Sequence, residues 1–369
     1  MDFEFTDDQL ALREAARAVL GAACPPSLVR AVHDGSGDGA TLWRSLVEHD
    51  WPALGLPEDV GGLGLGYLEV GILVEELGRV AAPSPYLATI TQLVPALRES
   101  GSTFLLGEVA SGAVTGSLAL AEDGRWEPGA VATTARRDGS TWVLDGVKTH
   151  VVDAGTATEL AVVARGDAGL GMFVVPASAV RCHTPQQLDP TLPTSTVTLQ
   201  GVSVQGERVL IEPGDPRAEL ALARVLEQAT TAVALSTVAS ARAIFDMTLQ
   251  YAKDREQFGR PIGSFQAIKH RLAECYLAVE RASALAWFAA LTIAEDDDRR
   301  ATATAMAKAA AGECQQLLTR DGLQLHGGVG FTWEHDLHFL LKRAMAGNLL
   351  FGNAATHRAR LAHLLGLVA

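Results

Sequence analysis

The sequence predicts an α+β protein in which a helical domain, a middle β domain and a second helical domain follow one another along 369 residues. Apolar residues recur at helical spacing in the first third of the chain and again from Arg217 to the end. Between these regions the pattern changes to a period of two, punctuated by glycine, proline and aspartate, as in short strands joined by turns. A chain of this length also favours two or three domains. We therefore expect domains at 1–112, 113–215 and 216–369.

The N-terminal domain is expected to begin with a capped helix, because Thr6 and Gln9 form a capping-box pattern ahead of an amphipathic run. The segment LWRSLVEHDW predicts a second helix, and YLEVGILVEELGRVAA predicts a third. Between them, GLGLG has glycines spaced somewhat as in a dinucleotide-binding fingerprint. It follows Pro57 and a loop rather than a strand, and no βαβ unit surrounds it, so we interpret it as a loop and helix entry.

The β domain is expected to start near residue 112. There, ATTARRDGSTWVLDG predicts two strands joined by a turn at Asp138-Gly139. The segments LAVVAR, GMFVVP and TSTVTLQGVSV continue the series of short strands. The series ends near EPGDP at 212–216, which gives a β domain of about 100 residues, a usual domain size.

The C-terminal region is expected to consist of long helices with two glycine-containing breaks. No glycine occurs between Ala218 and Phe258, so one helix could run through most of that segment. The sequence FGRPIG at 258–263 would end it, because two glycines and a proline cannot continue a helix. Further helices are predicted at 265–294 and 301–325, and HGGVGFTWEHD interrupts the chain before a last helical region.

Composition excludes some classes of partner. The net charge of −13 argues against nucleic acid or an anionic membrane surface as the main partner. The N-terminal stretch lacks the basic and apolar regions of a signal peptide, and no run of about 18 uninterrupted apolar residues appears. We therefore expect a cytoplasmic protein with no membrane segment. Its four separated cysteines are expected to be buried, reduced thiols: Cys24, Cys182, Cys275 and Cys314.

The order of these domains, together with REQFGRPIGSFQ and QLHGGVGFTWEHD, resembles the acyl-CoA dehydrogenase family. The resemblance covers essentially the whole chain, and PEDVGGLGLG is also similar to a loop of the family's N-terminal domain. It implies an oxidoreductase flavoprotein of lipid metabolism whose C-terminal domain is a four-helix bundle. Family members are usually tetramers, in which each FAD lies between one subunit's β domain and a neighbour's C-terminal domain.

By resemblance, the two glycine-containing breaks would bind the adenine and pyrophosphate side of FAD. Such a site needs fixed cations and exposed backbone N–H groups, which a glycine-rich helix break supplies. Arg255 would contact the neighbour's pyrophosphate, and glycines would permit close approach of the backbone. The cofactor-binding residues expected from this match are Arg255, Gln257, Phe258, Gln324, Gly327 and Gly328.

The segments that the family places against the flavin ring differ here. A Trp-Ile-Thr/Ser segment is usual after the position of Lys148, where this chain has His150 and Val152. The side chain of Val152 cannot offer the hydrogen bonds that the ring edge requires. The family's Thr-Glu-Pro loop is also poorly matched, since only Glu127-Pro128-Gly129 is retained superficially.

The catalytic base also has no clear match, so the catalytic residue stays unknown. Dehydrogenation needs a carboxylate that removes the Cα proton while hydride leaves Cβ. Where most members carry a Tyr-Glu-Gly-Thr motif, this chain places Phe351. An alternative family position on the long helix falls on Ala229 or Thr230, and the nearby Glu227 is a weak candidate that we interpret as a solvated carboxylate. His335 and His338 lack further ligands, so we predict no metal site and expect them to be exposed.

These observations favour three hypotheses. The first is a subunit of a hetero-oligomeric, heterotetrameric acyl-CoA dehydrogenase, similar to actinobacterial pairs that act on steroid-derived and other bulky acyl-CoAs. In it, this chain lacks the base and contributes the adenine half of a shared flavin site. The second is a self-sufficient acyl-CoA or acyl-carrier dehydrogenase, a homo-oligomer with a displaced base. The third is a cofactor-free structural subunit. The resemblance implies an acyl-CoA substrate and an electron-transfer flavoprotein as acceptor.

Overall fold

The computed structural model describes residues 4–368, and the chain divides into two compact units. Of the described residues, the first contains 4–39, 67–83 and 230–368, and the second contains 40–66 and 84–229. The N-terminal third therefore contributes helices to both units. The three domains expected from the sequence stay a prediction. The mixture of helical and sheet regions confirms the α+β fold class.

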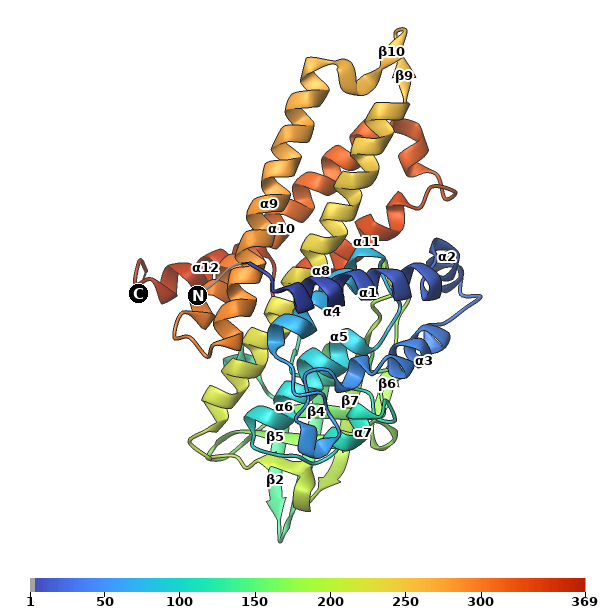
Figure 1. Cartoon of the computed structure of the whole chain (residues 1–369). Helices are drawn as coiled ribbons and strands as arrows, with labels where there is room; N and C mark the ends of the chain where they lie inside the picture. The colour runs from blue at the N-terminus through green and yellow to red at the C-terminus, as the bar shows by residue number, and fades with distance from the viewer. Residues whose placement is uncertain (1–3, 369) are drawn as a thin grey trace. The chain divides into compact units, whose positions relative to one another are not determined.

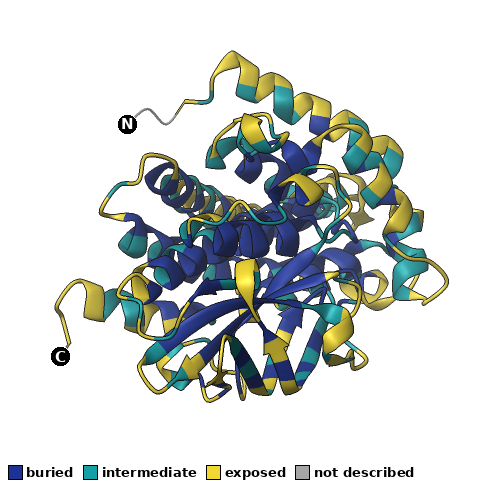
Figure 2. Cartoon of the chain, turned by 90° about the horizontal axis from the view of Figure 1, so that it is seen from below, coloured by how far each residue is buried: buried dark blue, intermediate teal, exposed yellow. Residues whose placement is uncertain are grey.

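The second unit is built on an eight-stranded sheet with the order β6-β7-β3-β2-β4-β5-β8, and β1 pairs with β4 in parallel. The strands β4 and β5 are buried along almost their whole length, so both faces of the sheet are covered there. Figure 2 shows buried parts of the sheet in dark blue. The strands are β1 Gly116–Ala119, β2 Thr134–Asp138, β3 Thr141–Val152, β4 Glu159–Gly166, β5 Gly169–Pro176, β6 Arg181–His183, β7 Thr194–Val204 and β8 Val209–Ile211.

The strands predicted from the sequence are confirmed. β2 and β3 pair as the expected antiparallel hairpin, but the turn lies one residue later than predicted: Asp138 pairs with Thr141, so the turn residues are Gly139, with a φ of 62°, and Ser140. The short strands β1, β6 and β8 were not predicted, because three or four residues give too little alternation to detect. The same unit includes the helices α3 Ala40–Glu48, α5 Tyr86–Ala88, α6 Val94–Glu99 and α7 Leu106–Ala110.

The first unit is a bundle of long helices, in which α9 and α10 pack against each other (Figure 1). The long helix expected from Ala218 is confirmed as α8, and its residues from Thr230 onward belong to this unit. The capping box at Thr6 and Gln9 is present at the start of α1. The helices are α1 Asp7–Ala23, α2 Pro26–His33, α4 Tyr67–Arg79, α8 Ala218–Asp254, α9 Gln266–Ala294, α10 Arg300–His326, α11 Leu337–Leu349 and α12 Ala354–Leu364.

Two of these helices, α8 and α9, are long and apolar enough to span a membrane by length and composition alone. The most apolar windows of α8 and α9 are 78% and 44% buried, respectively. Burial of this kind is also found in the core helices of water-soluble bundles, so the length of these helices is weak support for a membrane location. The GLGLG segment lies in a loop, as expected.

All four cysteines are free, as predicted. Burial raises the pKa of Cys24 to about 11 and the pKa values of Cys275 and Cys314 to about 12, so these thiols stay protonated at neutral pH. The expectation of burial is wrong for Cys182, which is half-buried because it lies on the short strand β6.

Candidate functional site

The break in the helical pattern at 258–263 is a β-hairpin. Helix α8 ends at Asp254, and the two-residue strands β9 Glu256–Gln257 and β10 Arg260–Pro261 pair in antiparallel fashion. The two turn residues, Phe258 and Gly259, have φ values of 55° and 75°. Positive φ at both positions is the requirement of a type I′ turn. The chain therefore leaves the helix in order to project a narrow loop beyond its end (Figure 1).

The side chains on this hairpin face outward. Arg255 and Gln257 are exposed, and Phe258 is 92% exposed. A phenylalanine with a left-handed backbone and no burial is unfavourable by itself, and such strain is most often found at ligand or partner contacts. Within residues 4–368, the guanidinium of Arg255 makes no hydrogen bond or ion pair, so its charge is available to an anion.

The second predicted wall lies at the C-terminal end of α10. Gln324 is exposed, and Gly327 ends the helix with a φ of 61° and a ψ of −142°, which a residue with a side chain rarely adopts. Gly328 has no such backbone requirement. A Cβ at Gly327 or Gly328 would meet no atom within 4 Å, so this backbone faces open space. Contacts within this chain therefore do not require glycine at 328. Close approach of a ligand to the backbone would require it.

The two walls lie at the same end of the bundle. The ring of Tyr251 in the last turns of α8 stacks on His326 at the end of α10, with centroids 4.5 Å apart. Nearby, the buried carboxylate of Asp321 binds Arg271 of α9 at 3.0 Å and Arg320 at 2.8 Å. Burial alone would raise the pKa of Asp321, but these two guanidiniums lower it. Sequence reasoning missed this ion-pair cluster, which ties α9 to α10 beside the predicted walls.

The histidines after the second break are not freely exposed, so that expectation is wrong. His335 and His338 are half-buried, and His338 stacks on Trp333 with centroids 4.6 Å apart. Burial lowers the pKa of His338, which favours the neutral ring at neutral pH. Among residues 4–368, no group of three or more histidine, cysteine or acidic residues could hold a metal ion.

In the β unit, the segment that departs from the family pattern is a strained turn at the end of β3. His150 and Asp153 both have positive φ, and the pairing of β3 with β7 shifts register between Lys148 and Val151. The exposed ring of His150 stacks on Trp126, with centroids 6.4 Å apart. The side chain of Val152 is buried. A flavin ring would find a buried hydrocarbon at 152 rather than a hydroxyl, so this part of the chain fits the ring poorly.

A buried ion pair supports the same region, and sequence reasoning missed it. The ammonium of Lys148 donates to the Glu122 carboxylate at 2.7 Å and to the Leu120 carbonyl at 3.2 Å. Glu122 also accepts the backbone N–H groups of Ala132 and Thr133. Burial lowers the pKa of Lys148 to about 8. The signal available in the sequence was Lys148 itself, a single lysine within an alternating strand. If its side chain faces the core, its ammonium needs a carboxylate partner.

At the position of the family's usual base, Phe351 is buried and has a φ of 56°. Two buried side chains hold this turn. The ammonium of Lys308 donates to the carbonyls of Gly347, Asn348 and Gly352 at 2.8–3.0 Å, and Nε2 of His357 donates to the Phe351 carbonyl at 2.9 Å. Burial lowers the pKa of Lys308 to about 7 and that of His357 to about 4. The turn at Phe351 is thus held through its carbonyl groups, and no carboxylate stands at position 351.

The interpretation of Glu227 as a solvated carboxylate is wrong. Its side chain lies on α8 and is only 5% exposed, because it faces inward on this helix. Burial of a carboxylate is a common feature of catalytic acids and bases, and also of structural ion pairs. Among residues 4–368, the structure adds no other carboxylate at the positions expected from the family.

Two family models match the chain. The N-terminal domain of acyl-CoA dehydrogenase matches residues 6–109, and the C-terminal domain of acyl-CoA dehydrogenase matches residues 219–365. Acyl-CoA dehydrogenase IpdE2 of Mycobacterium tuberculosis is 31% identical over 343 residues, which cover 92% of this chain and 91% of IpdE2.

Two solved structures have the same fold over almost the full length. The ChsE4-ChsE5 complex from Mycobacterium tuberculosis gives a TM-score of 0.91 at 27% identity and covers 100% of both chains. A variant of the Tcur3481-Tcur3483 steroid ACAD gives a TM-score of 0.88 at 30% identity and covers 98% of both chains.

Proposed function

This chain belongs to the acyl-CoA dehydrogenase family, and on that premise we propose that it is one subunit of a hetero-oligomeric acyl-CoA dehydrogenase. In this proposal it contributes the adenine and pyrophosphate half of a flavin site shared with a second acyl-CoA-dehydrogenase-like subunit. Members of the family are FAD-dependent oxidoreductases that act on acyl-CoA. The division of the flavin site between two different chains is the new element.

The proposal rests on one observation: this chain keeps the family's features on the adenine and pyrophosphate side of the flavin site but lacks those at the flavin ring and at the base. The helix-end features are kept: an exposed Arg255 whose guanidinium has no intrachain partner in residues 4–368, and a glycine pair whose backbone faces open space. The other half is replaced, since Val152 and Phe351 are buried apolar side chains where the family has a hydroxyl and a carboxylate. A protein that bound no flavin would have no use for the first set.

The chemistry explains why a partner is needed. A bound FAD would supply the hydride acceptor for the reaction, which also requires a carboxylate that removes the proton from Cα. This chain positions the cofactor through Arg255, whose guanidinium can donate two parallel hydrogen bonds to phosphate oxygens. The partner subunit would supply the base and the contacts to the flavin ring. The similarity to the ChsE4-ChsE5 complex supports a heteromer, and the similarity to a steroid ACAD supports a bulky acyl-CoA substrate.

A self-sufficient enzyme is the second candidate, and the burial of Glu227 favours it. If that carboxylate reaches the substrate, the chain needs no base from a partner. In either case we propose an electron-transfer flavoprotein as the electron acceptor and the cytoplasm as the location.

Flavin content separates these candidates. The chain is purified alone and also after co-expression with a base-bearing acyl-CoA-dehydrogenase-like partner, and flavin absorbance is measured per subunit. We expect little FAD in the chain alone and bound FAD in the complex. A yellow, active homo-oligomer with one FAD per chain would refute the shared site and support the self-sufficient enzyme. Absence of FAD from the complex would support a structural subunit.

A further inference from the structure

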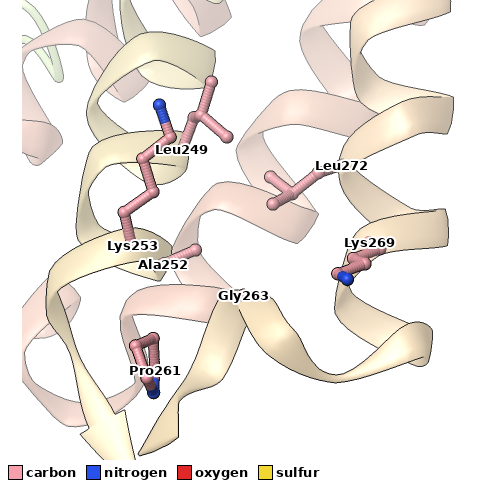
Figure 3. A pocket seen from close by; sticks show the side chains of 7 residues that line it. All are labelled: Leu249, Ala252, Lys253, Pro261, Gly263, Lys269 and Leu272. Carbon is pink, nitrogen blue, oxygen red and sulfur yellow. The ribbon is translucent and has the colours of Figure 1, made fainter.

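A pocket of about 460 Å³ lies between the C-terminal end of α8 and the start of α9, beside the hairpin (Figure 3). This volume is within the usual range for small-molecule sites. The six residues that we assign to the flavin site do not line it. It is lined by Leu249, Ala252, Lys253, Pro261, Gly263, Lys269 and Leu272.

The walls of the pocket are mainly apolar. Leu249 and Ala252 come from α8, and the side chain of Leu272 points from α9 into the space between the two helices (Figure 3). At the hairpin side, the backbone approaches closely, since a Cβ at Gly263 would lie 2.8 Å from the carbonyl oxygen of Ala252. Glycine at 263 therefore lets the chain close this side of the pocket without filling it.

Two ammonium groups flank these apolar walls, one from each helix. Lys253 and Lys269 are exposed, and within residues 4–368 neither ammonium group makes a hydrogen bond or an ion pair. The lining contains no aspartate or glutamate. The carboxylate of Asp254, next to Lys253 in the sequence, accepts Nε2 of Gln250 at 2.8 Å and forms no ion pair with either lysine. The pocket thus combines an apolar interior with two ammonium groups that form no ion pair among the described residues.

The use of lysine in this chain makes the pair notable. The whole sequence has five lysines. Lys148 and Lys308 are buried with hydrogen-bond acceptors, and Lys342 lies over the ring of Trp333 at 4.4 Å. The remaining two both line this one pocket.

We propose that this pocket binds a small amphipathic anion. The apolar body of the ligand lies between Leu249, Ala252 and Leu272, and its single carboxylate-type group lies at the edge of the pocket, where the ammonium groups of Lys253 and Lys269 attract it. Burial of the apolar body supplies most of the affinity, and the two ammonium groups select an anion over a neutral molecule. The inference does not depend on the proposed function, because the pocket and the predicted flavin contacts share no residue.

The test is calorimetric titration of sodium octanoate into the purified full-length protein. We expect saturable binding with one site per chain, weakened about tenfold in the Lys253→Gln/Lys269→Gln double variant, the scale of two partly exposed ion pairs. Lys342→Gln is the matched control and should bind as the wild type does. The neutral analogue 1-octanol should bind more weakly than octanoate to the wild type, and equally to the wild type and the double variant.

Each alternative result overturns the proposal. Octanoate could instead enter an acyl-substrate site, but that binding would be insensitive to Lys253 and Lys269. Absence of saturable binding would mean that the pocket is covered by a neighbouring polypeptide in the assembled protein. Because both lysines are exposed, thermal melts of the double variant should match those of the wild type and confirm that folding is retained. Flavin content is measured separately, so a failure here leaves the proposed function untouched.

Discussion

Removal of Glu122 from its buried ion pair with Lys148 should destabilise the β unit by several kcal/mol, because it leaves a buried ammonium without a counter-charge. The Lys148 side chain is 0% exposed, and its ammonium lies 2.7 Å from the Glu122 carboxylate. In Glu122→Ala, the acceptor left to this ammonium among the described residues is the Leu120 carbonyl at 3.2 Å. Breaking a buried pair by removing one partner costs about 3–5 kcal/mol. We expect a loss of about 4 kcal/mol for Glu122→Ala.

The double variant Glu122→Ala/Lys148→Met separates the stranded charge from the other contacts of Glu122. It removes the buried ammonium but still deprives the N–H groups of Ala132 and Thr133 of an acceptor at 2.7 and 2.9 Å. Both variants lose these two hydrogen bonds, so the difference in stability between them reports the stranded ammonium alone. The double variant should therefore be more stable than Glu122→Ala, although it carries one more substitution.

Urea denaturation measures these differences, and hydrogen exchange of the amides at 122–133 shows whether the effect is local. Glu212→Ala is the matched control, because Glu212 and Arg137 form an exposed pair with side chains 53% and 57% exposed. Such pairs contribute about 0–1 kcal/mol. If Glu122→Ala and Glu212→Ala lower the midpoint equally, or if the double variant is the least stable of the three, the reasoning is refuted.

Three further predictions concern the candidate site. Arg255→Ala should weaken FAD retention in the assembled complex by about 1.5–3 kcal/mol, the scale of hydrogen bonds to charged groups. Arg181→Ala, which removes another exposed arginine, serves as the control. Equal FAD affinity in the two variants would exclude Arg255 from the site. Glu227→Gln should leave kcat of the complex largely intact, because the partner supplies the base, and a loss of about 10²-fold or more would identify Glu227 as the base instead. Burial lowers the pKa of His357 to about 4 from its ordinary value of 6.5, so the folded state binds fewer protons than the unfolded state between these values. Stability is then full above about pH 6.5 and falls by about 2 kcal/mol by pH 5. Urea midpoints at pH 7 and pH 5 should differ less in His357→Gln, and an unchanged difference would show that another group titrates.

The fold could be predicted from sequence where the pattern was long. The helix from Ala218 and the hairpin of β2 and β3 were predicted because many residues repeat one period or flank an Asp-Gly pair. The sheet order could not be predicted, since β1 pairs with β4 across a separation that no local pattern encodes. The division of the N-terminal helices between two units depends equally on contacts distant in sequence.

The backbone of the candidate site could be predicted where glycine and proline interrupt the helices, whereas its buried polar groups could not. The glycine breaks located the ends of α8 and α10, because glycine and proline restrict the backbone directly, but they did not predict the hairpin that follows α8. The burial of Glu227 could not be read from the residue pattern, since a shift of about two residues, half a helical turn, exchanges an inward side chain for an outward one. Likewise, Lys308 and Asp321 stand in the sequence as ordinary helix charges, and only packing reveals that they are enclosed.

The turn at 350–353 has a consequence for how catalytic roles can be exchanged between related subunits. Its backbone is fixed by the amine of Lys308 and the imidazole of His357, and both of them bind carbonyl groups rather than the side chain at 351. The fold therefore requires of residue 351 only a left-handed backbone and a side chain that tolerates enclosure. Loss of an acid at this position would remove a chemical step without loosening the bundle. A duplicated enzyme with such a turn can become a non-catalytic partner by a single substitution and still assemble.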